Sequence, residues 1–382
     1  MNRVPGVAHM SESSVTRKPR QANWDLLRAL SMFLVVVVHS NSFFPQLLSG
    51  FNVGFAVGRA AIVCDPVFFM LSGFFALRPM RGSLGRYYLR KLSTIVLPLV
   101  AYSIVLYLVT SWPSIGLGGY LSYTAGLLGG GWWFIPALIP MLILAPFIYQ
   151  ALEALSDEWV VRLTKLIAVL YAWGVVCHLV VFAATAIDRP GIVNLMTMLA
   201  YYVPTKIPGG YLPIFIFGYL FRRLGAILSE EQKRLAARVG IVAWVLCFLF
   251  AGLGVPEDDP NQIWVFAAFG TFFLFDRVRV ADGVGQRLVT WAAKRSYTIY
   301  LLQYTTINLI HGIVYDQALL GDVSALPAAA SVLVWVATVV AAYLLALLAA
   351  SALDTFVLGP VQKLFDRLVT TRFSSQERRD VA

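Results

Sequence analysis

Residues 25–39 read DLLRALSMFLVVVVH, an apolar run that opens with Asp25 and Arg28 and carries His39 at its far end. On an α-helix, the eleven steps from Arg28 to His39 rotate through about 1100°, so both side chains point within about 20° of each other, roughly 16 Å apart along the axis. Asp25 lies one turn before Arg28 on nearly the same face. Such a polar stripe is not expected on a lipid-facing helix, because polar residues within membrane spans usually face the bundle interior. The spacing alone leaves two roles for His39 equally open, a structural histidine between helices and a general base that titrates near physiological pH.

The composition is that of a membrane protein. The chain has 382 residues, of which 59% are hydrophobic and only 13% charged, whereas a soluble protein carries about a quarter charged residues. Mean hydropathy is +0.74. The cysteines, Cys64, Cys177 and Cys247, lie in apolar runs without a CxxC pair, so we interpret them as buried hydrophobic residues rather than disulfides or metal ligands. We expect an all-α, polytopic integral membrane protein.

Ten apolar segments are candidates for transmembrane helices. They cover residues 24–44, 54–77, 92–112, 132–151, 163–186, 208–221, 239–254, 262–276, 296–316 and 326–350. The sixth, seventh and eighth are short against the roughly 20 residues that a bilayer requires. The longest outer connection, 187–207, contains aromatic residues and two prolines, and we expect it to lie along the membrane interface.

The formal net charge of +10 is explained by topology rather than by nucleic-acid binding. With the N-terminus inside, basic residues gather in every cytoplasmic stretch, and only Arg189 and Lys206 fall outside. The positive-inside rule therefore predicts ten spans with both termini in the cytoplasm. The predicted organisation is a flexible cytoplasmic tail at 1–22, a transmembrane domain at 23–358 and a basic cytoplasmic tail at 359–382.

The second apolar segment adds two charges, Arg59 and Asp65, within the membrane. Counted from the short outer loop, His39 and Arg59 lie at a similar depth, roughly 7–9 Å down, and Asp65 lies deeper. Arg59 and Asp65 are about 120° apart on a helix, which disfavours direct pairing unless Pro66 kinks the span. Two charges beside a histidine indicate a polar cavity.

Several segments together resemble a known family. An aspartate, an arginine three residues later and then a histidine after ten further residues resemble the opening motif of the membrane-bound acyltransferase family 3, and Asp25, Arg28 and His39 match it. Four later segments are similar to further family motifs, in the same order, so the resemblance covers residues 23 to about 305. These are FFMLSGFF (68–75), GWWFIPALIPMLILAPF (131–147), GGYLPIFIFGYLFRR (209–223) and SYTIYLLQ (296–303).

The resemblance implies an integral acyltransferase of about ten spans. Its members move an acyl group, usually acetyl, from an acyl-CoA to a hydroxyl, typically on a sugar of an envelope polysaccharide or glycolipid. It implies that His39 is catalytic and Arg28 essential. The chain departs from many members at Thr94, where a basic residue is common, and at Gln303, where many have histidine.

Coenzyme A is cytoplasmic and polyanionic, so basic residues on that side suit the donor. We expect donor contacts from Arg28, Arg86, Arg90 and Lys91. His39 would take the proton from the acceptor hydroxyl or, alternatively, carry the acyl group itself. Arg59 would stabilise the oxyanion or hold the sugar. The remaining candidates for acceptor binding are Asp65, Trp132, Trp133 and His311.

The expected partners are acyl-CoA, most simply acetyl-CoA as donor substrate, a glycan or glycolipid acceptor and the lipid bilayer. We expect no bound cofactor, no metal and no nucleic acid, and a multi-pass location in a bacterial plasma membrane. One alternative is a transporter or flippase for a lipid-linked sugar or small solute, with Asp25, Asp65 and Arg59 along its pathway. A non-catalytic sensor or assembly subunit ranks last, because it gives no reason for a histidine in the first span.

Overall fold

The structure is a computed structural model that describes residues 21–80, 82–201, 210–257, 259–316 and 323–367. Of the described residues, 83% are helical and none forms a strand. The predicted all-α, multi-pass fold is therefore confirmed. Most of the two predicted tails, together with Lys206, lies outside the described residues.

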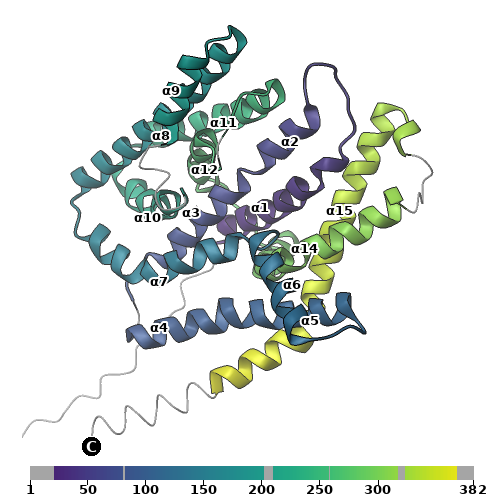
Figure 1. The fold of residues 1–382 in the computed structure, drawn as a ribbon. Helices are drawn as coiled ribbons and strands as arrows, with labels where there is room; N and C mark the ends of the chain where they lie inside the picture. Colours follow the sequence, from purple (N-terminus) through teal and green to yellow (C-terminus); the bar gives the residue numbers. More distant parts are fainter. Residues whose placement is uncertain (1–20, 81, 202–209, 258, 317–322, 368–382) are drawn as a thin grey trace, which may run out of the picture.

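The helices form one bundle (Figure 1). The α-helices are α1 (Ala22–Ser40), α2 (Val53–Ala61), α3 (Cys64–Ala76), α4 (Leu84–Lys91), α5 (Leu97–Ser111), α6 (Leu117–Gly129), α7 (Phe134–Glu153), α8 (Asp157–Ala186), α9 (Pro190–Tyr201), α10 (Leu212–Ile227), α11 (Glu230–Leu253), α12 (Gln262–Phe275), α13 (Val284–Lys294), α14 (Ser296–His311) and α15 (Ala328–Leu353). The shorter 3₁₀ and π segments are η1 (Asn41–Phe43), η2 (Leu92–Val96), η4 (Gly312–Asp316), η5 (Val323–Ala325) and η6 (Asp354–Leu358).

Each of the ten predicted spans coincides with a helical stretch, but only seven stretches within the described residues are long and apolar enough to cross a membrane. These are Ala22–Phe43, Val53–Ala76, Leu84–Ser111, Phe134–Glu153, Asp157–Ala186, Glu230–Leu253 and Ala328–Arg367. The other three predicted spans correspond to α10, α12 and α14, which have 16, 14 and 16 residues. At about 1.5 Å per residue these are shorter than a hydrocarbon core of about 30 Å. The count of ten and the sidedness stay predictions.

The connection predicted at 187–207 contains a helix. It is α9, which packs against α8. Its place at the membrane interface stays a prediction. Three further helices, α4, α6 and α13, were not expected from the sequence; α13 packs against α1.

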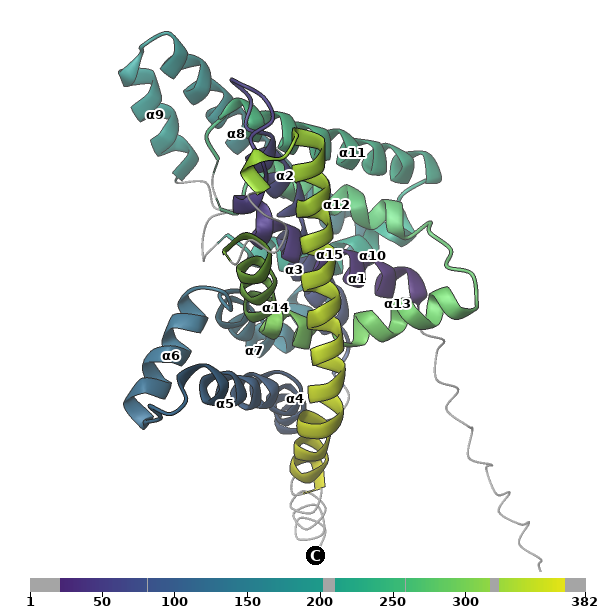
Figure 2. The ribbon, with the colours of Figure 1, turned by 90° about the vertical axis from the view of Figure 1, so that its right-hand side faces the viewer.

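The first helix lies at the centre of the bundle, against α2, α3, α13, α14 and α15 (Figure 1). Figure 2 shows α15 running along nearly the whole height of the bundle beside α14. Because α1 is surrounded, its polar side chains face other helices rather than lipid. The fold thus places the residues that open the sequence motif in the interior.

Helix pairs approach closely where glycine removes the side chain. A Cβ atom on Gly73 of α3 would lie 1.8 Å from the Phe215 carbonyl oxygen of α10, and one on Gly218 would lie 2.2 Å from the Met70 carbonyl oxygen. Such contacts are typical of membrane helices, which gain stability by packing small residues together. Both glycines fall within the segments that resemble family motifs, so those segments contribute to helix packing.

The second span is broken rather than straight. Pro66 has no N–H, so the carbonyl of Ile62 loses its usual donor and instead accepts from the Asp65 N–H at 2.9 Å. The chain therefore leaves α2 at Ala61 and restarts as α3 at Cys64. The sequence suggested a kink at Pro66, and the second span is broken there.

Candidate active site

A cavity of about 150 Å³ lies beside α1. It is bounded by α1, α3, η2, α7 and α14, which are brought together from both halves of the sequence. Most of its walls are apolar, and a few polar groups converge on it, as is usual for small-molecule sites. The lining side chains are Arg28, Met32, Val35, His39, Asp65, Phe68, Ser72, Ile95, Trp133, Phe134, Ile135, Leu138, Ser296, Tyr297 and Tyr300.

Arg28 and His39 both line this cavity. They lie on one face of α1, with Met32 and Val35 between them, so they are separated by about 16 Å along the helix. The cavity therefore connects a permanently charged guanidinium group to an imidazole through an apolar passage. A long ligand with an anionic end would fit this arrangement better than a compact one.

His39 is held by a tyrosine from another helix. Its Nδ1 atom lies 2.8 Å from the hydroxyl of Tyr304 on α14, and the two rings are 4.5 Å apart. Gly131 makes room for this tyrosine, because a Cβ there would lie 2.5 Å from the Tyr304 ring. Since one ring nitrogen is engaged, Tyr304 fixes both the orientation of the imidazole and the position of its remaining nitrogen.

Asp65 and Trp133 supply further polar groups to the same cavity. Asp65 lies in the first turn of α3, where the helix dipole favours a carboxylate, and the Cys64 thiol donates to its Oδ1 at 3.5 Å. Trp133 packs against Tyr211, with ring centroids 5.3 Å apart. The structure thus joins Asp65 and Trp133 to His39 in one space.

The Arg28 end of the cavity lies beside further guanidinium groups. The guanidinium carbons of Arg28 and Arg78 lie 5.1 and 5.3 Å from the centroid of the same Phe75 ring. Arg78 and Arg222 each donate to the carbonyl of Phe74, at 3.2 and 3.3 Å, and so cap the end of α3. Three positive charges therefore gather at this end of the cavity.

Other predicted site residues lie outside the cavity. Asp25 is buried and accepts a hydrogen bond from Thr290 of α13 at 3.2 Å, so it ties α13 to α1. Trp132 is 1% exposed and its indole donates to the Leu301 carbonyl at 3.1 Å. His311 is buried edge-on against Phe43.

Arg59 is also directed away from His39. Its Nε lies 2.5 Å from Glu257, which in turn accepts from Asn261 at 3.2 Å. The connection between α11 and α12 thus supplies Glu257 as the ion-pair partner of Arg59, and Asp259 accepts a hydrogen bond from Tyr211. Arg59 and Asp65 are not paired with each other, because the break before α3 separates them.

The other three residues predicted to contact the donor do not line the cavity. Arg86 and Arg90 lie on α4, and neither is among the residues that line the cavity. Lys91 lines a neighbouring apolar groove. Of the four predicted donor residues, the structure places Arg28 alone in the cavity.

The sequence analysis missed the tyrosines of α14. Ser296, Tyr297 and Tyr300 line the cavity, and Tyr304 is bonded to His39. Their spacing of three and four residues places them on one helix face, and this pattern could have identified them. A row of hydroxyl groups opposite α1 is the part of the site that the opening motif does not reveal.

Comparison with known proteins identifies the family of the chain. The family model described as an acyltransferase domain, of acyltransferase family 3, matches residues 21–351. This range contains every helix that bounds the cavity. Searches of curated proteins and of solved structures gave no match. The chain is a multi-pass membrane acyltransferase and belongs to acyltransferase family 3.

Proposed function

We propose that the protein is an O-acyltransferase of a bacterial plasma membrane, which moves an acyl group, in the simplest case acetyl, from cytoplasmic acyl-CoA to a hydroxyl of an envelope glycan or glycolipid. The observation that carries this proposal is that Arg28 and His39 line the two ends of one largely apolar cavity. A polyanionic donor with a long flexible arm and a reactive thioester at its tip matches that charge distribution. Its phosphates bind at one end, and its acyl group reaches the imidazole at the other.

The donor phosphates bind at the guanidinium cluster of Arg28, Arg78 and Arg222. Guanidinium groups hold phosphates through paired, charge-assisted hydrogen bonds, and the backbone contacts of Arg78 and Arg222 at the end of α3 hold their charges beside Arg28. Arg86, Arg90 and Lys91 on α4 add to the positive field on the cytoplasmic side. Apolar residues such as Met32, Val35 and Leu138 surround the arm and exclude water that would hydrolyse the thioester.

His39 acts as the general base in this mechanism. In the tautomer that suits it, the Nδ1–H donates to the Tyr304 oxygen, so Nε2 is free to accept the proton of the acceptor hydroxyl. The acceptor oxygen attacks the thioester carbonyl and forms a C–O bond. The C–S bond then breaks, and the departing thiolate takes the proton from His39 to give an ester and free coenzyme A.

Hydroxyl groups of α14 face the developing oxyanion. The Tyr300 oxygen accepts a hydrogen bond from the Phe134 N–H at 3.2 Å, so its own hydrogen remains available to a negatively charged oxygen in the cavity. Asp65 and Trp133 hold the acceptor: the carboxylate accepts from sugar hydroxyls and the indole packs on the sugar ring. Arg59 has no part in this step, because it is paired with Glu257.

Transfer from a radiolabelled donor tests the proposed function. Membranes that contain the chain are incubated with acetyl-CoA that carries the radiolabel in its acetyl group. Envelope glycans are then separated from protein and lipid. We expect label on glycan hydroxyls, removable by mild base as esters are, and none in membranes without the chain. Movement of a glycolipid or sugar across reconstituted vesicles in the absence of any donor, with no labelled ester, would instead establish the transporter.

A further inference from the structure

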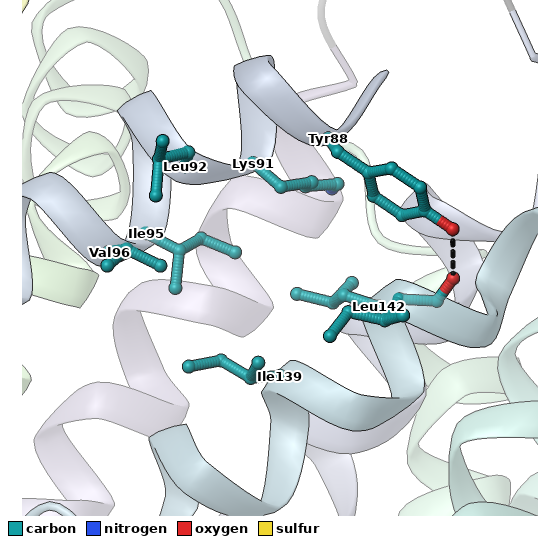
Figure 3. Close-up of a pocket in the computed structure, with 8 residues that line it drawn as sticks. Tyr88, Lys91, Leu92, Ile95, Val96, Ile139 and Leu142 are labelled. Atoms are coloured by element: carbon teal, nitrogen blue, oxygen red, sulfur yellow. Dashed lines mark hydrogen bonds between the residues drawn. The ribbon is translucent and has the colours of Figure 1, made fainter. Parts of the chain in front are cut away.

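A second hollow, larger than a single side chain, lies next to the active-site cavity along η2 and α7. It is an apolar groove of about 300 Å³ between the third span and α7 (Figure 3). One wall is the stripe from Tyr88 to Val96 at spacings of three and four residues, and the other contains Ile139 and Ile143. Ile95 lines both the groove and the active-site cavity, so a single side chain forms part of both walls.

Two tyrosines fix one end of the groove. Pro146 has no N–H, so the carbonyl of Leu142 lacks its usual helical donor, and the Tyr87 hydroxyl donates to it instead at 2.8 Å. The Tyr88 hydroxyl donates to the next carbonyl, that of Ile143, at 2.9 Å (Figure 3). These bonds connect α4 to α7, so the groove is built into the fold.

A single cation lies within this apolar surface. The side chain of Lys91 extends along the groove toward Tyr88 (Figure 3), and its amine is 5.5 Å from the centroid of the Tyr87 ring. Among the described residues no carboxylate lies within ion-pair distance of this amine. A lysine in an apolar environment is stabilised by an anionic partner, which here would have to be part of a ligand.

The groove opens toward the surroundings of the bundle. Leu92 and Ile143, on its two edges, are 40% and 50% exposed. In a chain that spans a membrane, such apolar exposed edges meet lipid chains. The stripe from Tyr88 to Val96 rises through eight residue steps, or about 12 Å, close to the roughly 15 Å depth of one leaflet.

We propose that this groove is a binding site for one anionic phospholipid, with the phosphate at Lys91 and one acyl chain between η2 and α7. The bound chain packs behind Ile95 and supports the wall of the active-site cavity from outside. Positive charge near the end of a span attracts anionic lipid, and the groove adds a shaped seat for its chain. Binding of the lipid is argued from the groove alone and is measured without donor or acceptor, so the proposal stands or falls independently of the proposed function.

Native mass spectrometry of the purified full chain tests this site. The protein is stripped of lipid in neutral detergent and then mixed with phosphatidylglycerol or phosphatidylcholine of identical chains, without any acyl-CoA. We expect one retained phosphatidylglycerol, at an occupancy at least about fivefold above that of phosphatidylcholine, since a cation near the headgroup favours an anionic lipid by about this factor. The I143W variant, which fills the groove, is expected to lose the retained lipid.

Leu144, the residue after Ile143, provides a matched control. Leu144 is 48% exposed on the same helix but does not line the groove, so L144W adds the same bulk outside it and is expected to bind lipid as the wild type does. L92W fills the groove from the opposite wall and replaces I143W if that variant does not fold. Equal retention in the groove-filling and control variants, or equal retention of the two lipids, would overturn the proposal. Displacement of the lipid by a long-chain acyl-CoA would assign the groove to the donor's chain instead.

Discussion

Acyl transfer is expected to fall by about 10²- to 10⁴-fold when His39 is replaced by alanine, the range for loss of a general base. The physical reason is that no other histidine among the described residues lines the cavity, so nothing remains to take the proton of the acceptor hydroxyl. The measurement is the rate of labelled ester formation by purified chain at saturating donor. The variant should keep its donor affinity, because Arg28 at the other end of the cavity is untouched.

Two further variants separate chemistry from folding. His178 lies on α8 beside a different, small cavity near Glu257, so H178A should transfer at close to the wild-type rate. Y304F keeps the ring but removes the group that orients His39, and a loss of about tenfold is expected, the worth of about one hydrogen bond. Transfer by H39A at more than a tenth of the wild-type rate would show that His39 is not the base.

The second large effect is expected from Arg28. Replacement by alanine should raise the donor KM by roughly 10- to 100-fold, because a charge-assisted hydrogen bond to phosphate contributes about 1.5–3 kcal/mol. R28K should recover part of this affinity, since lysine keeps the charge but lacks the planar fork. The test measures ester formation against acetyl-CoA concentration for the wild type and both variants.

A surface arginine serves as the matched control for Arg28. Arg162 is paired with Glu158 one turn away on α8, outside the cavity, so R162A should leave the donor KM unchanged. An unchanged donor KM in R28A, with transfer intact, would remove the donor phosphates from this end of the cavity. Loss of kcat without any change in KM would assign Arg28 to positioning rather than to donor binding.

The fold class could be predicted from the sequence because it depends on the apolar runs along the chain and not on contacts between distant segments. Long apolar runs must be helical in lipid, and each predicted span coincides with a helix. The number of true crossings did not follow, because α10, α12 and α14 are shorter than a bilayer requires. Residues along α10 and α12 are largely buried by neighbouring helices, so hydropathy alone does not distinguish a short interior helix from a span.

The site was predictable only within single helices. The shared face of Arg28 and His39 follows from 3.6 residues per turn, and both line one cavity. Pairings between distant segments did not follow: Tyr304 with His39, Glu257 with Arg59, and Thr290 with Asp25. Equal depth in the membrane suggested that Arg59 lies near His39, but depth does not give direction, and the break before α3 decides it.

The central claim is that the donor reaches His39 through this cavity. The most direct test is whether the donor protects a cysteine introduced in the cavity from modification by a maleimide. Val35 lines the cavity between Arg28 and His39, whereas Leu30 is 45% exposed on another face of the same helix. In a chain whose three native cysteines are replaced by alanine and which still transfers label, V35C and L30C are treated with a membrane-permeant maleimide, with and without acetyl-CoA. Saturating donor is predicted to slow modification of V35C severalfold and to leave L30C unchanged. Equal modification of V35C with and without donor, in protein that still transfers the acyl group, would contradict the account.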